Sequence, residues 1–257
     1  MHVLSIANHK GGTGKTATTR ALGDLLARDG LRVLMIDLDP QGSLTTSCGL
    51  GDDVKPNLTD VLGGSQPGKL TLDKVIKPVS ERLDLAPSNL DMAAIELGIN
   101  SRLGREHILN NALASVATNY DVCLIDCPPS LSLLVVNALA ASNAVLIPTQ
   151  PMPVDVAGVK LFISTVEAIR DNLNKNLSIL GILTTFYDDR LTTHKAGLEA
   201  MKKAGWPVLP VNIGRSVRVG EAAGLGESIM TFEPGNPQAA AYEQLGELVK
   251  LWLKKIK

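Results

Sequence analysis

The chain has 257 residues, of which 45% are hydrophobic and 20% are charged, and its formal net charge is -1. This composition is typical of an ordinary globular protein, and the near-neutral charge excludes a basic field over the whole surface that would attract nucleic acid. Aromatic residues make up only 3% of the chain, which predicts an aliphatic core and argues against recognition of single strands by base stacking.

The sequence shows no sign of export or of a membrane span. No secretory signal is visible, because residues 1–8 already follow the pattern of a strand. No apolar run approaches the ~18 residues that a membrane-spanning helix needs. The three cysteines, Cys48, Cys123 and Cys127, form no paired framework of the kind found in secreted domains. We therefore expect a cytoplasmic protein that forms one domain over residues 1–257.

Short apolar runs alternate with amphipathic stretches along the chain. Strand-like runs occur at 2–8, 32–37, 120–129, 143–150, 177–186 and 206–212, and a helix pattern extends from residue 16 to about residue 28. The runs are rich in valine, isoleucine and leucine without polar alternation, as in strands covered on both faces. The segment 50–80 is rich in turn formers, and we expect it to be a surface excursion. The pattern predicts an α/β fold with a doubly wound, mostly parallel sheet flanked by helices.

The stretch NHKGGTGKTA, residues 8–17, connects the first strand to the first helix and has the form of a phosphate-binding loop. Its glycines allow backbone N–H groups to turn toward phosphate oxygens, and the helix N-terminus adds positive potential. Lys15 would reach the β and γ phosphates, and the Thr16 hydroxyl would bind Mg²⁺. The usual pattern has glycine five residues before the Gly-Lys pair, where this chain has His9, and the loop carries an additional lysine, Lys10.

Three aspartates follow predicted strands at the edge where this loop lies. Asp37 and Asp39 stand in MIDLDPQG, and strand alternation predicts that both point to the same side. One could support the metal shell while the other orients a water for attack on the γ-phosphate. Asp126 ends the run VCLID before two prolines, in the form of an acid that supports Mg²⁺ through water. The neighbouring Cys123 and Cys127 offer too few ligands for a metal site, and we interpret them as small core residues.

A local basic segment is hidden by the average charge. Only one acid, Glu199, lies among the basic residues between positions 190 and 218, which are Arg190, Lys195, Lys202, Lys203, Arg215 and Arg218. Such a run is often a solvated face, but it can also contact nucleic-acid phosphates.

These motifs together resemble the ParA/Soj-type partition ATPases, within the larger ParA/MinD group of P-loop proteins with a deviant Walker A loop. The resemblance extends over nearly the whole chain. It rests on KGGTGKT, DLDPQG, APSNLDMAAIEL at 86–97, LIDCPPSL, LIPTQPMPVD at 146–155 and IGRSVRVGEAAGLGESI at 213–229.

The resemblance implies a set of roles in binding and hydrolysing ATP with Mg²⁺. Lys10 would reach across a nucleotide-sandwich homodimer to the phosphates of the other subunit, and Asp39 would position the attacking water, so that Lys10, Lys15 and Asp39 are the implied catalytic residues. Mg²⁺ would lie at Thr16, near Asp37 and Asp126. The implied nucleotide contacts are Lys10, Gly11, Gly12, Thr13, Gly14, Lys15, Thr16 and Ala17, with Pro210 and Asn212 as a looser match for the adenine.

The resemblance also implies partners. Arg190, Arg218 and Arg215 match positions where the family binds double-stranded DNA without sequence preference. A ParB-like protein or another cargo adaptor would stimulate slow hydrolysis, and repeated cycles on the nucleoid would segregate a plasmid or chromosome. Longer relatives carry an N-terminal helix-turn-helix domain, which we do not expect here because the first strand begins at once.

Other functions remain open. A ParA-like ATPase can position a protein organelle or chemoreceptor cluster instead of DNA. A MinD-like ATPase binds membranes through a C-terminal amphipathic helix. Here apolar residues at helical spacing adjoin a basic flank, namely Leu245, Leu248, Val249, Trp252 and Ile256 with Lys250, Lys254, Lys255 and Lys257. We favour a last helix packed on the sheet, so membrane binding is not expected. A metallocluster reductase would need two suitably placed cysteines in each subunit, which this chain does not offer. A catalytically inactive scaffold would not need the lysines and aspartates described above.

Overall fold

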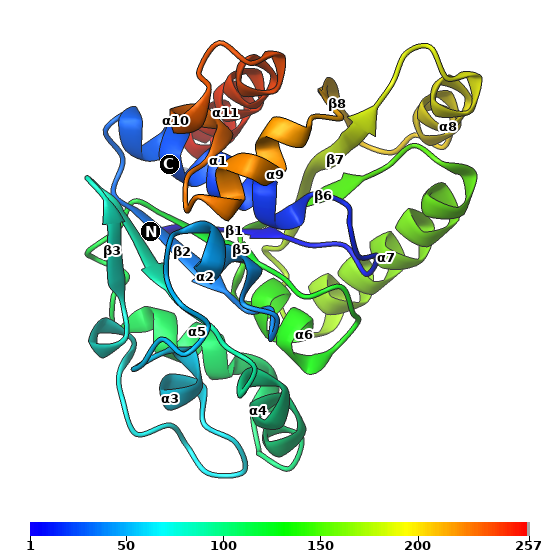
Figure 1. Ribbon diagram of the computed structural model, residues 1–257. Coiled ribbons are helices and arrows are strands. Elements are labelled where there is room, and N and C mark those ends of the chain that lie inside the picture. The colour runs from blue at the N-terminus through cyan, green and yellow to red at the C-terminus, as the bar shows by residue number, and fades with distance from the viewer. Residues whose placement is uncertain (256–257) are drawn as a thin grey trace.

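The computed structural model describes residues 1–255, which contain eight strands in one central sheet (Figure 1). The strands are β1 (His2–Ile6), β2 (Val33–Asp37), β3 (Lys77–Ser80), β4 (Leu83–Ala86), β5 (Val122–Asp126), β6 (Ala144–Thr149), β7 (Ser178–Tyr187) and β8 (Val208–Gly214). Their order across the sheet is β3-β4-β2-β5-β1-β6-β7-β8, and every neighbouring pair is parallel except β3 with β4. The predicted doubly wound, mostly parallel α/β fold is confirmed.

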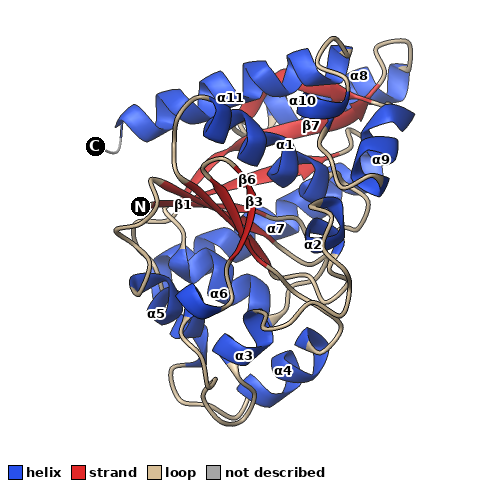
Figure 2. Cartoon of the chain, turned by 60° about the vertical axis from the view of Figure 1, so that its left-hand side comes forward, coloured by secondary structure: helices blue, strands red, loops and turns tan. Residues whose placement is uncertain are grey.

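Helices cover both faces of this sheet, as Figure 2 shows. They are α1 (Lys15–Arg28), α2 (Ser43–Ser47), α3 (Leu58–Leu62), α4 (Met92–Ile99), α5 (Ile108–Ala114), α6 (Leu133–Ala141), α7 (Pro153–Asn172), α8 (Thr192–Lys203), α9 (Val217–Gly224), α10 (Ile229–Phe232) and α11 (Pro237–Lys255). One core lies between the sheet and α3 to α8, and the other lies between the sheet and α1, α10 and α11. Because both faces are covered, the central strands are mostly apolar at successive positions rather than at alternate ones.

The prediction of a surface excursion at 50–80 is only partly correct, because much of the segment is exposed but several of its apolar residues are buried. Leu58 and Leu62 of α3, and Leu72 and Val75 further along, are buried in the first core. The segment also contains β3, the antiparallel edge strand. Turn formers indicated the many bends correctly, but four apolar side chains spaced among them were enough to fix the segment against the sheet.

The last helix packs on the protein. In α11, Leu245 and Val249 are fully buried in the second core, while Leu248 and Trp252 pack partly against it. The favoured interpretation of this helix is therefore confirmed for its described part, and Ile256 and Lys257 lie outside the described residues. Among residues 1–255, no helix is both long and apolar enough to cross a bilayer.

The sheet brings together groups that are far apart in the sequence. β1 lies between β5 and β6, and Ile6 at its end is in register with Asp126. Asp37, at the end of β2, is in turn the register partner of Asp126. The loop that follows β1 therefore faces both aspartates at the carboxyl edge of the sheet, where ligands bind in this class of fold.

Candidate active site

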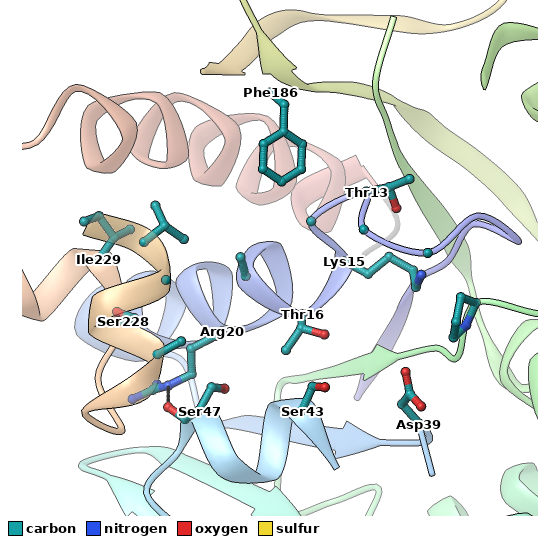
Figure 3. A pocket seen from close by; sticks show the side chains of 18 of the residues that line it. Thr13, Lys15, Thr16, Arg20, Asp39, Ser43, Ser47, Phe186, Ser228 and Ile229 are labelled. Carbon is teal, nitrogen blue, oxygen red and sulfur yellow. Dashed lines mark hydrogen bonds between the residues drawn. The ribbon is translucent and has the colours of Figure 1, made fainter. Parts of the chain in front are cut away.

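The loop between β1 and α1 forms one wall of a cavity of about 410 Å³ (Figure 3). Gly12 and Gly14 have φ angles of 68° and 81°, a left-handed conformation that side chains with a Cβ rarely adopt. Gly14 is the N-cap of α1 and no side chain caps its first turn, so the helix offers open N–H groups to an anion. All the predicted loop contacts from 11 to 17 line this cavity, namely Gly11, Gly12, Thr13, Gly14, Lys15, Thr16 and Ala17.

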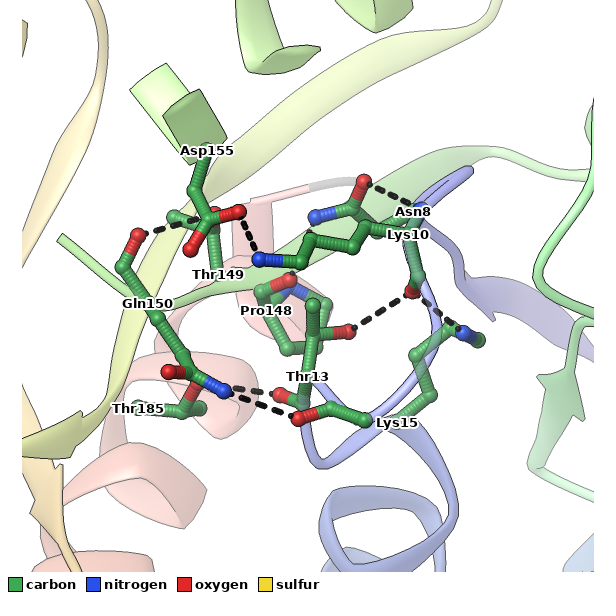
Figure 4. Close-up of polar contacts among 10 residues, drawn as sticks. Asn8, Lys10, Thr13, Lys15, Pro148, Thr149, Gln150, Asp155 and Thr185 are labelled. Atoms are coloured by element: carbon green, nitrogen blue, oxygen red, sulfur yellow. Dashed lines mark hydrogen bonds and ion pairs between the residues drawn. The ribbon is translucent and has the colours of Figure 1, made fainter. Parts of the chain in front are cut away.

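The loop is held in shape before any ligand binds. Asn8 donates to the carbonyl of Pro148 at 2.8 Å and accepts from the backbone N–H of Lys10 at 3.2 Å. The Thr185 hydroxyl donates to the carbonyl of Thr13 at 2.9 Å, and the Gln150 amide donates to the carbonyl of Gly12 at 3.1 Å (Figure 4). These bonds turn loop carbonyls toward the protein, so that the N–H groups are left for the cavity.

Lys15 is buried, with only 7% of its surface exposed, and its amine donates to the carbonyl of Lys10 at 3.1 Å. Burial lowers the pKa of this amine, and the negative charges of Asp126 and Asp39 oppose that effect. A buried cation at the base of a phosphate loop is stabilised further by a bound polyphosphate, which supplies the missing negative charge.

Asp126 lies behind the loop and acts on the cavity through Thr16. The Thr16 hydroxyl donates to Asp126 at 2.7 Å, and Thr19 donates to the same carboxyl group at 3.4 Å. Burial raises the pKa of Asp126 to about 8, and the nearby charge of Asp37 adds to this effect. A buried carboxyl group whose pKa is raised this far beside a cavity is a mark of a functional site, and a bound metal ion would favour its ionised form.

The structure separates Asp37 from Asp39, which corrects the prediction that both point to one side. β2 ends at Asp37, so strand alternation does not continue to Asp39. Asp37 is fully buried and accepts from the backbone and hydroxyl of Thr45, both at 2.8 Å, and burial raises its pKa to about 6. Asp39 lies in the following turn and lines the cavity. Asp39 is thus placed to reach a substrate, whereas Asp37 fixes the start of α2.

The donor set of the cavity suits Mg²⁺. The Thr16 hydroxyl and the Asp39 carboxylate offer hard oxygen atoms at the cavity, and Asp126 lies behind Thr16, while Lys15 and Arg20 are the cations of the lining. In residues 1–255, no cluster of three or more histidine, cysteine or acidic side chains could hold a metal by itself. Mg²⁺ is commonly bound by one or two protein ligands together with water and phosphate oxygens, which fits this arrangement.

Lys10 does not line the cavity of its own loop. Its amine forms an ion pair with Asp155, in the first turn of α7. The Lys10 side chain is 42% exposed, whereas that of Asp155 is 1% exposed. The structure therefore places Lys10 on the outer side of the loop, where it is accessible to another molecule.

A second hollow, of about 240 Å³, adjoins the loop at Gly14 and Ala17 and is lined by Phe186 and Val219. Phe186 has a φ of 51°, an uncommon conformation for a residue with a side chain, and its ring borders both cavities. Asn212 lines the neighbouring groove, and its side-chain oxygen is buried with no partner among the described residues. Pro210 is exposed and does not line this groove or either of the two cavities, and its contact with the adenine stays a prediction.

The three arginines predicted to bind DNA lie near one another beyond the ends of β7 and β8. Arg190 and Arg215 line one open groove, and Arg218 stands on α9 beside it. Arg190 pairs with Asp188 at 2.7 Å, and Arg218 pairs with Glu233 at 2.6 Å and also with Glu221.

Sequence reasoning missed several residues of the site. Asp155 was inside a quoted motif, but no local pattern links it to Lys10. Arg20, one turn into α1, borders the cavity while it pairs with Asp24 at 2.6 Å and donates to the carbonyl of Ser47 at 3.3 Å. Its buried position depends on contact with α2, which no local sequence pattern shows. The predictions for Cys123 and Cys127 are confirmed, since both are fully buried core residues.

Comparison with known proteins agrees with this geometry. A family model described as an AAA domain matches residues 1–179. The chain is 36% identical over 253 residues to the chromosome partitioning protein ParA of Caulobacter vibrioides, covering 97% of this chain and 94% of that protein. It is also 36% identical over 249 residues to the sporulation initiation inhibitor protein Soj of Bacillus subtilis, covering 96% of this chain and 97% of that protein. The fold is similar to the solved structure of cobyrinic acid a,c-diamide synthase from Mycobacterium smegmatis with bound ATP analogue and magnesium. The TM-score is 0.87 and the identity is 34%, and the match covers 98% of this chain and 95% of that chain.

Proposed function

Because the chain belongs to the ParA/MinD family of P-loop ATPases, we propose that it is a ParA-type ATPase whose ATP-bound dimer holds nonspecific duplex DNA and positions a cargo. Membership of this family makes the protein an ATPase that uses ATP and Mg²⁺. The finer roles below, in dimerisation, in DNA binding and in response to a partner, are our proposal.

The position of Lys10 is the observation that carries this proposal. A P-loop needs one lysine for its own phosphates, and Lys15 already occupies the cavity, whereas Lys10 is half exposed outside it. A cation delivered by a second subunit stabilises the charge that develops in phosphoryl transfer, as an arginine finger does. Val154, next to Asp155 in the chain, and Leu131, two residues after Pro129 of the cavity wall, are exposed apolar residues that suit contact with a second copy.

In the hydrolysis of ATP, residues of this chain would hold the phosphates, the metal and the attacking water in place. Loop N–H groups and Lys15 would bind the phosphates, and Thr16 would hold Mg²⁺, which neutralises phosphate charge when bound. Asp39 would orient the attacking water, because it is the aspartate that lines the cavity. Asp126 would fix the Thr16 hydroxyl at 2.7 Å, and Asp37 would support the metal shell only indirectly, through α2.

DNA would bind across the arginines when the dimer forms. One subunit offers Arg190, Arg215 and Arg218, and two of these are paired with acids of the same chain, so a monomer would bind weakly. Doubling the contacts in the dimer would make binding dependent on ATP and sensitive to salt. A ParB-like protein or another cargo adaptor would stimulate hydrolysis and release the dimer from the nucleoid. The cargo would be a plasmid or chromosome, with a protein assembly as the alternative.

The name of the similar synthase suggests a different reaction, the formation of an amide. A glutamine-dependent synthase needs an accessible thiolate to release ammonia. In this chain burial raises the pKa of Cys48 to about 12, and Cys123 and Cys127 are fully buried. These thiols are unsuited to such chemistry, which favours simple hydrolysis of ATP.

The first test is a binding assay with the Asp39→Ala variant loaded with ATP, which should bind the nucleotide without turning it over. We expect it to bind nonspecific duplex DNA in a salt-sensitive way and not to bind anionic liposomes. The ADP-loaded variant is the matched control and should stay off DNA. Binding to liposomes alone would instead assign the protein to a membrane-surface role and would make the three arginines ordinary surface residues.

A further inference from the structure

The ion pair between Lys10 and Asp155 joins residues 145 positions apart, and its two members differ greatly in exposure (Figure 4). The Asp155 side chain is 1% exposed, and its second carboxylate oxygen is buried with no hydrogen-bond partner among the described residues. A buried carboxylate without partners is unfavourable, so Lys10 is the side-chain cation that compensates this charge.

The position of Asp155 in α7 makes its charge tolerable without the lysine. It occupies the first turn of the helix, after the N-cap Met152 and Pro153. The dipole at a helix N-terminus stabilises a negative charge in the first turn. Release of Lys10 therefore has a modest cost, and the pair can open and close reversibly.

The segment that carries Asp155 is attached to the phosphate loop at other points as well. Asn8 donates to the carbonyl of Pro148, and Gln150 donates to the carbonyl of Gly12. The end of β6 and the Gln150 side chain that follows it thus hold the loop from one side, and Asp155 lies a few residues further along the same segment. This places the carboxylate where it meets the amine of Lys10 on the outer side of the loop.

We propose that Asp155 is a latch, a positioning residue that holds Lys10 on its own subunit until the phosphates of a second subunit take its place. This inference rests on the proposed function, in which Lys10 acts across the dimer. A triphosphate carries more negative charge than one carboxylate, so it can draw the amine away. In a symmetric dimer two latches must open, and the effect of one latch on dimerisation is therefore squared.

The test is the Asp155→Asn substitution, which preserves shape and removes the charge. A partly exposed ion pair shifts an equilibrium by about threefold. We expect ATP-dependent dimerisation, measured by sedimentation in the Asp39→Ala background, to tighten by about tenfold because two latches are lost. Asp171→Asn, at the other end of α7, makes the same change in charge and should leave dimerisation unaltered. Unchanged or weaker dimerisation of a folded Asp155→Asn protein would refute the latch.

A double-mutant comparison separates the latch from the proposed function. In the Lys10→Ala background, Asp155→Asn should have no effect on dimerisation, because the latch acts only through Lys10. If Lys10→Ala dimerises and hydrolyses ATP normally, the cross-subunit role of Lys10 is wrong. If Lys10→Ala is defective while Asp155→Asn matches the unmodified protein, only the latch is wrong.

A measurement on the nucleotide-free protein tests the latch without any dimer. An amine held against a buried carboxylate is less accessible to an acylating reagent than an amine in solvent. In the unmodified protein, Lys10 should react several-fold more slowly than the exposed Lys160 of α7, as followed by peptide mass spectrometry. In the Asp155→Asn variant, Lys10 should be acylated faster, while the acylation rate of Lys160 should not change. Equal rates for Lys10 in the two proteins would contradict the latch, whatever the dimer does.

Discussion

The buried carboxyl group of Asp126 predicts an unusual dependence of stability on pH. Burial raises its pKa from an ordinary 3.8 to about 8 in the nucleotide-free protein. Between these values the folded state binds about one more proton than the unfolded state. The free energy of unfolding must then fall as pH rises through this range. The substitution Asp126→Asn removes the titrating group and keeps its shape, so it should remove this part of the dependence.

The expected size of the effect follows from the linkage relation. One additional bound proton in the folded state lowers the unfolding free energy by about 1.4 kcal/mol for each unit of pH. Asp37, whose pKa is raised to about 6, contributes mainly below that pH. Over a window from about pH 6.2 to about 7.4, the unmodified protein should lose about 1–2 kcal/mol of unfolding free energy relative to Asp126→Asn. Loss of the bond from Thr16 shifts the variant by a constant amount and leaves the slope unaffected.

Urea unfolding at constant ionic strength, with EDTA and without nucleotide, measures this slope. The matched control is Asp121→Asn, which removes a carboxylate whose pKa is lowered to about 2 by its hydrogen bonds from Arg32. That group is ionised throughout the window, so the unfolding free energy of its variant should change with pH as that of the unmodified protein does. If the unfolding free energy of Asp126→Asn also changes with pH in the same way, Asp126 is ionised in the folded protein and the reasoning about its burial is wrong. Mg²⁺ with ATP should abolish the difference in slope by favouring the ionised form.

Three other outcomes follow from the structure. Lys15→Ala should abolish ATP binding, since it removes the buried cation of the cavity, and calorimetry that finds normal affinity would contradict the assigned role. Arg218→Ala should weaken DNA binding by the ATP-loaded dimer and reduce the slope of log affinity against log salt by about 1.8, for two lost phosphate contacts, and an unchanged slope would place the DNA elsewhere. Gly197→Ala should lower the free energy of unfolding by about 1–3 kcal/mol, because the new Cβ would lie 2.0 Å from the carbonyl oxygen of Pro151. Gly220→Ala is the control and should be tolerated, because a Cβ there meets nothing within 4 Å. Equal stability of the two variants would contradict the packing argument.

Local pattern explains which parts of the fold could be predicted. The six predicted strand runs correspond to β1, β2, β5, β6, β7 and β8, because each is a largely apolar run, and all but the edge strand β8 lie inside the sheet with most residues buried. β3 and β4 were missed because each has only four residues, and β3 alternates between exposed and half-buried positions at the edge of the sheet. Short strands of that kind depend on pairing with distant neighbours rather than on their own sequence.

The same distinction applies to the site. The sequence by itself determined the phosphate loop, because glycines that need left-handed backbone, a lysine and a threonine are contiguous and lie between a strand and a helix. It also placed Asp126 at the carboxyl edge of the sheet. Only the tertiary structure decided that Asp37 is buried behind Thr45, that Asp39 alone of that pair faces the cavity, and that Lys10 rests on Asp155. Those outcomes depend on how β2, α2 and α7 pack against one another, and contacts between such distant segments leave no periodic signal in the chain.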